Sequence, residues 1–314
     1  MAIPYAVASM IVQEHKNQPI TGRILLIGRQ TIDMNVQTAV ALVESILGHV
    51  RTKNPALDHS TRARNEPTVT TDTISDAGFF SLFTDAIVTA VDVTDYEGAD
   101  IVHDMCSELP SHMIENYDFV YNGSCLDNIF DVAAAMRNFG LCLKPTGRLF
   151  QIEAGTTSLA AYVVFSPEWF TDFFIANNWE DGNIYVCRSG EEVAGLRFMQ
   201  NPWDIYHWRP FWVTNDKLIY DIKPRSSLIG MEHIVSIAQR GNGTVHVNPV
   251  QATYRPQYML DAQVNTCLRW LESDRPIVTG HDAGPQYPYV VQDDSGKKIE
   301  RCYKYCGTIR HPDH

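Results

Sequence analysis

Residues 117–155, YDFVYNGSCLDNIFDVAAAMRNFGLCLKPTGRLFQIEAG, decide the fold of this chain. The β-branched and aromatic run from Tyr117 to Tyr121 predicts a strand. Asp131 is placed to cap a helix whose apolar residues recur at helical spacing, and Pro145 should end that helix because proline supplies no amide donor. Arg148 to Glu153 is a second apolar run. A strand, a helix and a strand of this length predict a βαβ unit with two parallel strands.

Such units indicate where a ligand would bind. In parallel sheets, ligands lie beyond the carboxyl ends of the strands, which here are residues 122–128 and 153–157. A third segment where a ligand could bind lies earlier in the chain. The run RILLIG, residues 23–28, is typical of a strand buried on both faces, and a loop and a helix from Val36 follow it.

The whole chain has 314 residues, of which 45% are apolar and 20% are charged, so it can bury an ordinary core. We expect an α/β domain over residues 1–241, with a short helical segment at 1–20, and a C-terminal extension over 242–314 that packs on the core or on a partner subunit. The later strands follow one another without helices between them, which indicates antiparallel pairing at a sheet edge. The remaining predicted strands are residues 88–93, 99–103, 183–188, 204–208 and 234–239.

Charge and composition exclude some classes of partner. The net charge of −12 gives no electrostatic reason to approach a nucleic-acid backbone or an anionic lipid surface. No apolar run reaches the roughly 18 residues that span a bilayer. Seven scattered cysteines, most of them within apolar segments, are typical of reduced thiols. These features predict a cytoplasmic protein.

Two acidic residues end neighbouring predicted strands. Asp92 stands where a carboxylate can accept hydrogen bonds from both hydroxyls of a ribose. Asp104 stands where a carboxylate can accept from the exocyclic amino group of a base such as adenine. Together they suggest an adenosine-shaped site. The alternative, that both simply terminate strands, stays open at this stage.

From about residue 20 to residue 240 the chain resembles the class I S-adenosylmethionine-dependent methyltransferases. RILLIG is similar to the first strand of that family, Asp92 to its ribose-binding acid, and His-Asp-Met at 103–105 to its adenine-side motif. LKPTGRLFQIEAG, residues 143–155, resembles its Leu-Lys-Pro-Gly-Gly turn and fifth strand. The resemblance implies a Rossmann-like, seven-stranded, mostly parallel sheet with helices on both faces.

The resemblance also implies S-adenosylmethionine as the cofactor. Its expected binding residues are Gly28, Arg29, Gln30, Asp92, Asp104, Met105 and Asn122. The chain departs from the family in the first loop, where Gly28 is followed by Arg-Gln-Thr instead of further glycines. The side chains at 29 and 30 can either replace the missing backbone contacts, with Gln30 or Thr31 bonding the methionine moiety, or fill the site.

Other nucleotide ligands fit the sequence less well. Binding of NAD needs a G-x-G-x-x-G turn, and GRQTID at residues 28–33 is not one. Binding of ATP by a P-loop fails for the same reason. A dehydrogenase is therefore disfavoured.

Methyl transfer to a hydroxyl needs a group that removes its proton. We favour His207, which lies in the aromatic segment WDIYHWRPFW, as the catalytic base; the other candidates are His103, Glu153 and His233. A histidine packed among aromatic residues is the plainer alternative. The spacing Cys302-x-x-x-Cys306, with His311 and His314, is too loose to predict a metal site.

The sequence therefore predicts a methyltransferase with a small-molecule acceptor, such as the hydroxyl of a carbohydrate or of a secondary metabolite. An inactive methyltransferase-like subunit for binding or assembly is the alternative, favoured by the altered first loop. The many aromatic residues near the expected acceptor side suit an acceptor pocket, a homodimer interface or an ordinary core, so the oligomeric state stays open.

Overall fold

The computed structural model describes most of the chain, and the statements below refer to that part. The described residues are 2–59, 72–156, 161–189, 202–213, 218–219, 232–273, 275–278, 290–292 and 295–312. The polar segment at 51–72, for which we expect a surface loop, lies partly outside them, and His314 lies wholly outside them.

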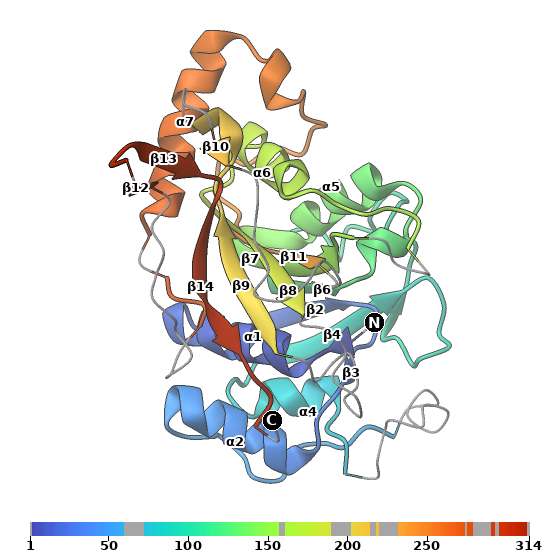
Figure 1. Ribbon diagram of the computed structural model, residues 1–314. Helices are drawn as coiled ribbons and strands as arrows, with labels where there is room; N and C mark the ends of the chain where they lie inside the picture. The colour runs from blue at the N-terminus through green and yellow to red at the C-terminus, as the bar shows by residue number, and fades with distance from the viewer. Residues whose placement is uncertain are drawn as a thin grey trace.

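A nine-stranded sheet forms the centre of the molecule (Figure 1). Its order is β14-β9-β8-β11-β7-β6-β2-β4-β5. In chain order, the strands are β2 (Arg23–Ile27), β4 (Ile87–Asp92), β5 (Ile101–Val102), β6 (Tyr117–Gly123), β7 (Leu143–Ala154), β8 (Asp181–Ser189), β9 (Trp203–Trp208), β11 (Glu232–Gln239) and β14 (Tyr303–Ile309).

Five neighbouring strands, β5-β4-β2-β6-β7, are all parallel. Counted along the chain, their spatial order is 3-2-1-4-5, which is the order of a doubly wound Rossmann sheet. The chain moves outward from β2 in one direction to β4 and β5, and in the other direction to β6 and β7. The topological switch point therefore lies between β2 and β6, and it is the place where such sheets bind ligands.

The other half of the sheet is antiparallel. β11 lies between β7 and β8 and runs opposite to both, and β9 and β14 extend the sheet beyond β8. The prediction of seven mostly parallel strands is therefore wrong in number and in proportion: there are nine strands, and four of the eight neighbouring pairs are antiparallel. The extra strand β14 comes from the predicted C-terminal extension, where the sequence offered no sign of a partner strand.

Helices cover both faces of the sheet, as predicted (Figure 1). One face packs against α1, α2 and α4, and the other packs against α5, α6 and α7. The helices are α1 (Tyr5–Asn17), α2 (Val36–Leu47), α4 (Asp76–Ser81), α5 (Val132–Cys142), α6 (Pro167–Ala176) and α7 (Gln257–Leu271). The division into a domain at 1–241 and an extension stays a prediction.

The central βαβ unit forms as the sequence predicts, with one difference. The Asp131 side chain caps α5 by accepting a hydrogen bond from the amide of Ala134, at 3.1 Å. The helix ends before Pro145, however, and β7 already begins at Leu143. The turn is made inside the strand, where Thr146 adopts a φ of 72° next to Gly147.

Two small sheets flank the large one. β1 (Ala2–Ile3) pairs in parallel with β3 (Thr31–Ile32), so the N-terminal segment holds the loop that follows β2. A second sheet consists of β10 (Leu218–Ile219), β13 (Lys298–Arg301) and β12 (Val290–Gln292).

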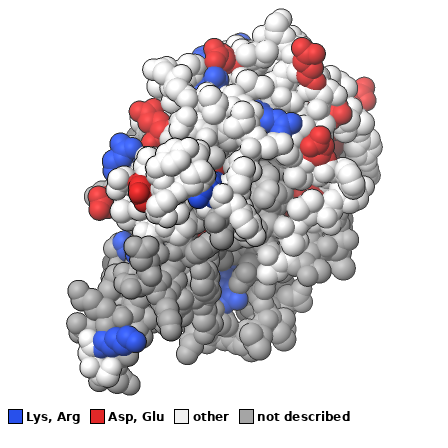
Figure 2. Space-filling model, turned by 90° about the horizontal axis from the view of Figure 1, so that it is seen from above, with Lys and Arg blue, Asp and Glu red and all other residues white. Residues whose placement is uncertain are grey.

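The surface carries charges of both signs. Figure 2 views the molecule from above Figure 1, and on this face acidic and basic side chains are interspersed among uncharged ones. Within the described residues, no helix has both the length and the apolarity that a membrane crossing requires.

Candidate functional site

The loop after β2 begins at the switch point. Gly28 has a φ of 71°, a left-handed conformation that favours glycine, and its amide donates to the carbonyl of Val91 in β4 at 2.7 Å. The backbone therefore turns sharply across the carboxyl ends of β2 and β4. This turn brings the side chains of Arg29 and Gln30 over the edge of the sheet.

Arg29 is fixed by three partners. Its guanidinium contacts Asp76 at 3.3 Å and Asp100 at 2.9 Å, and its Nε donates to the carbonyl of Gly98 at 3.2 Å. Asp76 is buried, and burial raises the pKa of its carboxyl while the Arg29 charge opposes that rise. Arg29 thus ties the loop after β2 to the start of α4 and to the segment before β5.

Gln30 fills the crevice at the switch point. Its side chain is 3% exposed, and its Nε2 donates to the carbonyls of Ile27 and Gly28, at 3.0 and 3.1 Å. A Cβ placed on Gly123 would lie 2.2 Å from Gln30 Oε1, so the carboxamide lies directly against the backbone at the end of β6. Among the described residues, Oε1 has no hydrogen-bond partner.

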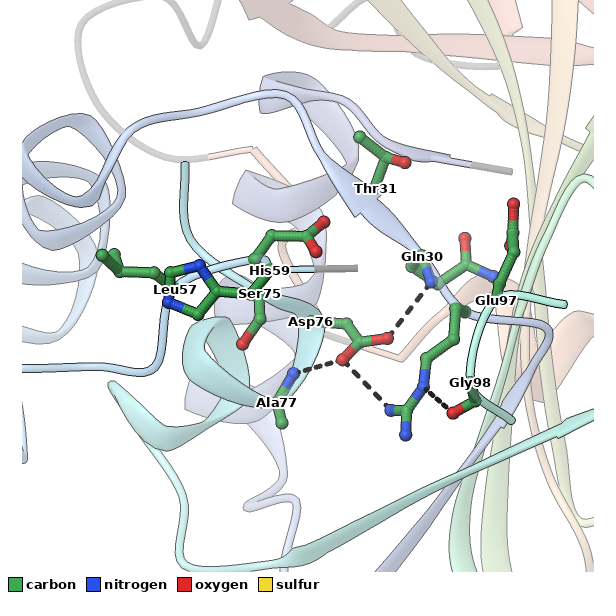
Figure 3. A pocket seen from close by; sticks show the side chains of 11 residues that line it. Gln30, Thr31, Leu57, His59, Ser75, Asp76, Ala77, Glu97 and Gly98 are labelled. Carbon is green, nitrogen blue, oxygen red and sulfur yellow. Dashed lines mark hydrogen bonds and ion pairs between the residues drawn. The ribbon is translucent and has the colours of Figure 1, made fainter. Parts of the chain in front are cut away.

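A pocket of about 300 Å³ lies beside this loop (Figure 3). It is bordered by the Arg29–Thr31 loop, the start of α4 and the Glu97-Gly98 turn. Figure 3 shows the carboxylate of Asp76 accepting hydrogen bonds from the backbone amides of Gln30 and Ala77, at 3.2 and 2.6 Å. Asp76 and Gln30 therefore both line this pocket, and the Asp76 carboxylate fixes the main chain of Gln30.

Asp92 and Asp104 lie at neighbouring strand ends, as predicted. Asp92 closes β4 and accepts from the amide of Thr94 at 3.2 Å. Asp104 follows β5, is exposed, and accepts from the amide of Cys106 at 2.8 Å. That backbone hydrogen bond lowers the pKa of Asp104, so its carboxylate is ionised at neutral pH. Both side chains stabilise their own turns, which is the alternative role considered above, and both retain solvent-exposed surface.

Met105 connects the Asp104 turn to α5. Its side chain is buried in the core, and its carbonyl accepts from the Asn138 side chain at 2.8 Å. The same amide group donates to the carbonyl of Ser107 at 2.7 Å. Helix α5 thus fixes the backbone of the turn on which Asp104 stands.

Asn122 and Glu153 form a buried polar centre under the turn after β6. Asn122 Nδ2 donates to Glu153 Oε1, and Asn122 Oδ1 accepts from the amide of Cys125 at 3.1 Å. Glu153 also accepts from the amides of Leu126 and Asp127, at 3.2 and 2.9 Å. These two amides belong to a short 3₁₀ turn, η1 (Leu126–Asn128). Asn122 is fully buried, so its side chain supports the turn from within the protein and does not face solvent.

The pKa of the Cys125 thiol depends on groups at the ends of β4, β6 and β7. Burial, followed by the carboxylates of Glu153 and Asp92, raises its pKa to about 12. Asp92 on β4 is therefore close enough to the turn after β6 to act on it electrostatically. The edge brings together Gly28, Gln30, Asp92 and Asn122 from three strands.

His207 lies elsewhere. It is on β9, four strands from Asn122, which corresponds to roughly 19 Å at about 4.8 Å per strand. Its ring stacks on Tyr185 at 4.9 Å, and its Nε2 donates to Asn183 Oδ1 at 3.1 Å. Burial lowers its pKa to about 3. The structure does not bring His207 to the edge where the other candidates gather.

Two acidic residues at this edge were not predicted from the sequence. Asp76 and Asp100 anchor Arg29 although they lie 47 and 71 residues after it in the chain. A cue exists only for Asp76: it follows Ser75, whose hydroxyl caps α4 by accepting from the amide of Gly78 at 3.0 Å. No local pattern marks Asp100 as a partner of Arg29.

Comparisons with known proteins add little. No family model matches the chain, and no curated protein matches it. Among solved structures, it is similar to a SAM-dependent methyltransferase of Thermotoga maritima, with 12% identity, 74% of this chain and 88% of that chain covered, and a TM-score of 0.38. It is also similar to the 1,6-didemethyltoxoflavin-N1-methyltransferase of Burkholderia thailandensis, with 11% identity, 76% and 80% covered, and a TM-score of 0.35.

A third match is the CMeT domain of the citrinin polyketide synthase, with 12% identity and a TM-score of 0.24; it covers 44% of this chain and 30% of the length of that one. A Rhodobacter sphaeroides protein assigned to the Zn-dependent alcohol dehydrogenases is also among the matches. These TM-scores lie below 0.5, so we base no conclusion about family or activity on them. What the fold and the edge themselves define is an α/β protein with a Rossmann-ordered parallel half and carboxylates at the ends of β4 and β5.

Proposed function

We propose that this chain is an S-adenosylmethionine-dependent methyltransferase with a small-molecule acceptor. One observation carries the proposal: Asp92 and Asp104 follow neighbouring strands beside the switch point of a sheet whose parallel strands have the order 3-2-1-4-5. An acid at the end of the second strand suits the hydroxyls of a ribose, and an acid after the third strand suits the amino group of a base. The motif resemblance described above points to the same cofactor.

The residues present fit the adenosine half of this cofactor. Asp92 would hold the ribose, Asp104 the adenine amino group, and the left-handed turn at Gly28 would let the backbone approach the ligand closely. When bound, the cofactor supplies an activated methyl group. The chain's own part is then to hold both reactants in line and to exclude water.

We place the acceptor beside the turn after β6, where two aromatic rings are exposed. Phe130 and Tyr162 are both exposed, their ring centroids lie 6.2 Å apart in an edge-to-face contact, and the amide of Tyr162 donates to the carbonyl of Asp127 at 2.8 Å. These rings therefore stand beside the turn after β6. We propose an acceptor with a flat or sugar-like apolar surface, methylated on a hydroxyl.

Replacing Asp92 by alanine tests the proposal. In calorimetric titrations, the wild-type chain should bind S-adenosylhomocysteine one to one, and Asp92→Ala should weaken that binding about 10- to 100-fold, because charge-assisted hydrogen bonds to the ribose are lost. The change in unfolding free energy should stay small, since the side chain lies at a strand end.

Asp95→Ala is the matched control, because Asp95 is exposed in the loop directly after β4. This control should bind like the wild type. Undiminished affinity in both Asp92→Ala and Asp104→Ala would remove the site assignment.

A binding or assembly subunit without transfer activity is the second candidate. The observation that favours it is the Gln30 side chain, which fills the crevice at the switch point. A folded wild-type chain that binds neither S-adenosylmethionine nor S-adenosylhomocysteine at millimolar concentration would decide for this candidate.

A further inference from the structure

The carboxamide of Gln30 occupies a place suited to an amino group. Its Nε2 donates to two main-chain carbonyls at the end of β2, those of Ile27 and Gly28. Two carbonyl oxygens that converge on one point recognise an N–H donor, and a charged ammonium more strongly than a neutral amide. Gln30 thus supplies, from within the chain, the kind of group that a ligand with an amino-acid end would bring.

The other end of the carboxamide lacks a hydrogen-bond partner in the part of the chain that the structure describes. Oε1 is buried against Gly123, and no donor among the described residues reaches it. A buried acceptor without a hydrogen bond costs free energy that the same group recovers in water. The closed position of Gln30 is therefore stabilised by Nε2 and destabilised by Oε1.

Gln30 also blocks the crevice by volume. The side chain is 3% exposed and lies between the end of β2 and the end of β6, which are the two strands that border the switch point. Asp76 fixes the main chain of Gln30 through its amide. The side chain must rotate away before another group can reach the two carbonyls.

We infer that Gln30 determines specificity by competing with the amino-acid end of the donor for the carbonyls of Ile27 and Gly28. The inference rests on the proposed function and adds a preference to it. Ligands that carry only the adenosine half bind at Asp92 and Asp104 without disturbing Gln30. Ligands that carry the amino-acid half must displace its carboxamide first.

Two substitutions separate volume from hydrogen bonding. Gln30→Ala removes the side chain and opens the crevice, whereas Gln30→Met keeps the volume and removes the polar atoms. The probes are S-adenosylhomocysteine and 5′-methylthioadenosine, which lacks the amino-acid end, and both are titrated by calorimetry into the full chain. Thermal unfolding of each variant checks the fold.

Gln30→Ala should bind S-adenosylhomocysteine about tenfold more tightly than the wild type, because two net hydrogen bonds no longer have to be broken. The affinity for 5′-methylthioadenosine should not change. Gln30→Met should gain less than Gln30→Ala, because its two hydrogen bonds are gone but the crevice stays filled.

Three outcomes overturn it. Equal or weaker binding of S-adenosylhomocysteine by a folded Gln30→Ala variant would show that Gln30 does not compete with the ligand. An equal gain for both probes would indicate general loosening of the loop. Absence of binding of either probe to both the wild type and Gln30→Ala would overturn the proposed function and this inference together.

Discussion

Replacing Arg148 by methionine should lower the free energy of unfolding by about 3 to 5 kcal/mol, because the change removes one partner of a buried ion pair. The Arg148 Nε lies 2.6 Å from Glu14 Oε1, and the two side chains are 4% and 2% exposed. Burial raises the pKa of Glu14, and the Arg148 charge opposes that rise. Without Arg148, the basic partner that remains to this carboxylate among the described residues is Arg275, at 2.7 Å.

Urea denaturation of the purified chain measures the effect. Lys144→Met is the matched control, because Lys144 also pairs with an acid, Asp118, at 2.8 Å, but the two side chains are 39% and 33% exposed. Exposed pairs contribute about 0 to 1 kcal/mol. Equal losses in the two variants would show that the Arg148 pair is not buried in solution.

The Arg148 network also shows what local sequence patterns leave out. Arg275 contacts both Glu14 of α1 and Asp181 of β8, so a single group of charges joins the N-terminal helix, the sheet and the C-terminal extension. The helical segment at the N-terminus and the strand that carries Arg148 were both predicted from the sequence. Their pairing was not, because the partners lie more than one hundred residues apart and no spacing rule links them.

The fold was predictable where the signals were local. The βαβ unit at 117–155 follows from apolar runs, a capping aspartate and a turn, all of which act within a few residues. The antiparallel half was predictable only in outline. β9 and β14 pair across a long stretch of chain, and register between distant strands depends on tertiary packing rather than on any local pattern.

The candidate site also combines residues that the sequence could indicate with contacts that it could not. The positions of Asp92 and Asp104 at this edge were predictable because both end predicted strands, and strand ends in parallel sheets collect ligands; that they bind a ligand stays a prediction. The departure at Arg29 and Gln30 was visible in the sequence, but its consequence was not. Whether Gln30 binds a ligand or fills the crevice depends on Gly123, which approaches it from another strand.

Glu153→Ala should lower the free energy of unfolding by about 3 kcal/mol, since it leaves three buried donors without their acceptor. These donors are Asn122 Nδ2 and the amides of Leu126 and Asp127. Glu108→Ala is the control, because Glu108 is exposed. Its free energy of unfolding should stay within about 0.5 kcal/mol of that of the wild type. Because the three donors hold the turn after β6, amide exchange should accelerate at Leu126 and Asp127 in the Glu153 variant.

The pH dependence of stability should identify the charge state of Glu153. Burial raises its pKa well above the ordinary value of 4.5, and the Asp127 carboxylate adds to the rise. The folded chain then binds this proton more tightly than the unfolded chain, so the group's contribution is full below the ordinary pKa and is lost as the pH rises through the raised value.

Glu153→Gln cannot titrate at this position and serves as the reference. The difference in unfolding free energy, wild type minus Glu153→Gln, should therefore fall as the pH increases from about 4 towards 8 in urea denaturation. A difference that grows with pH would mean that the three donors stabilise the carboxylate more than burial destabilises it. The turn after β6 would then rest on an ionised glutamate, and its negative charge would attract a cationic ligand to this edge of the sheet.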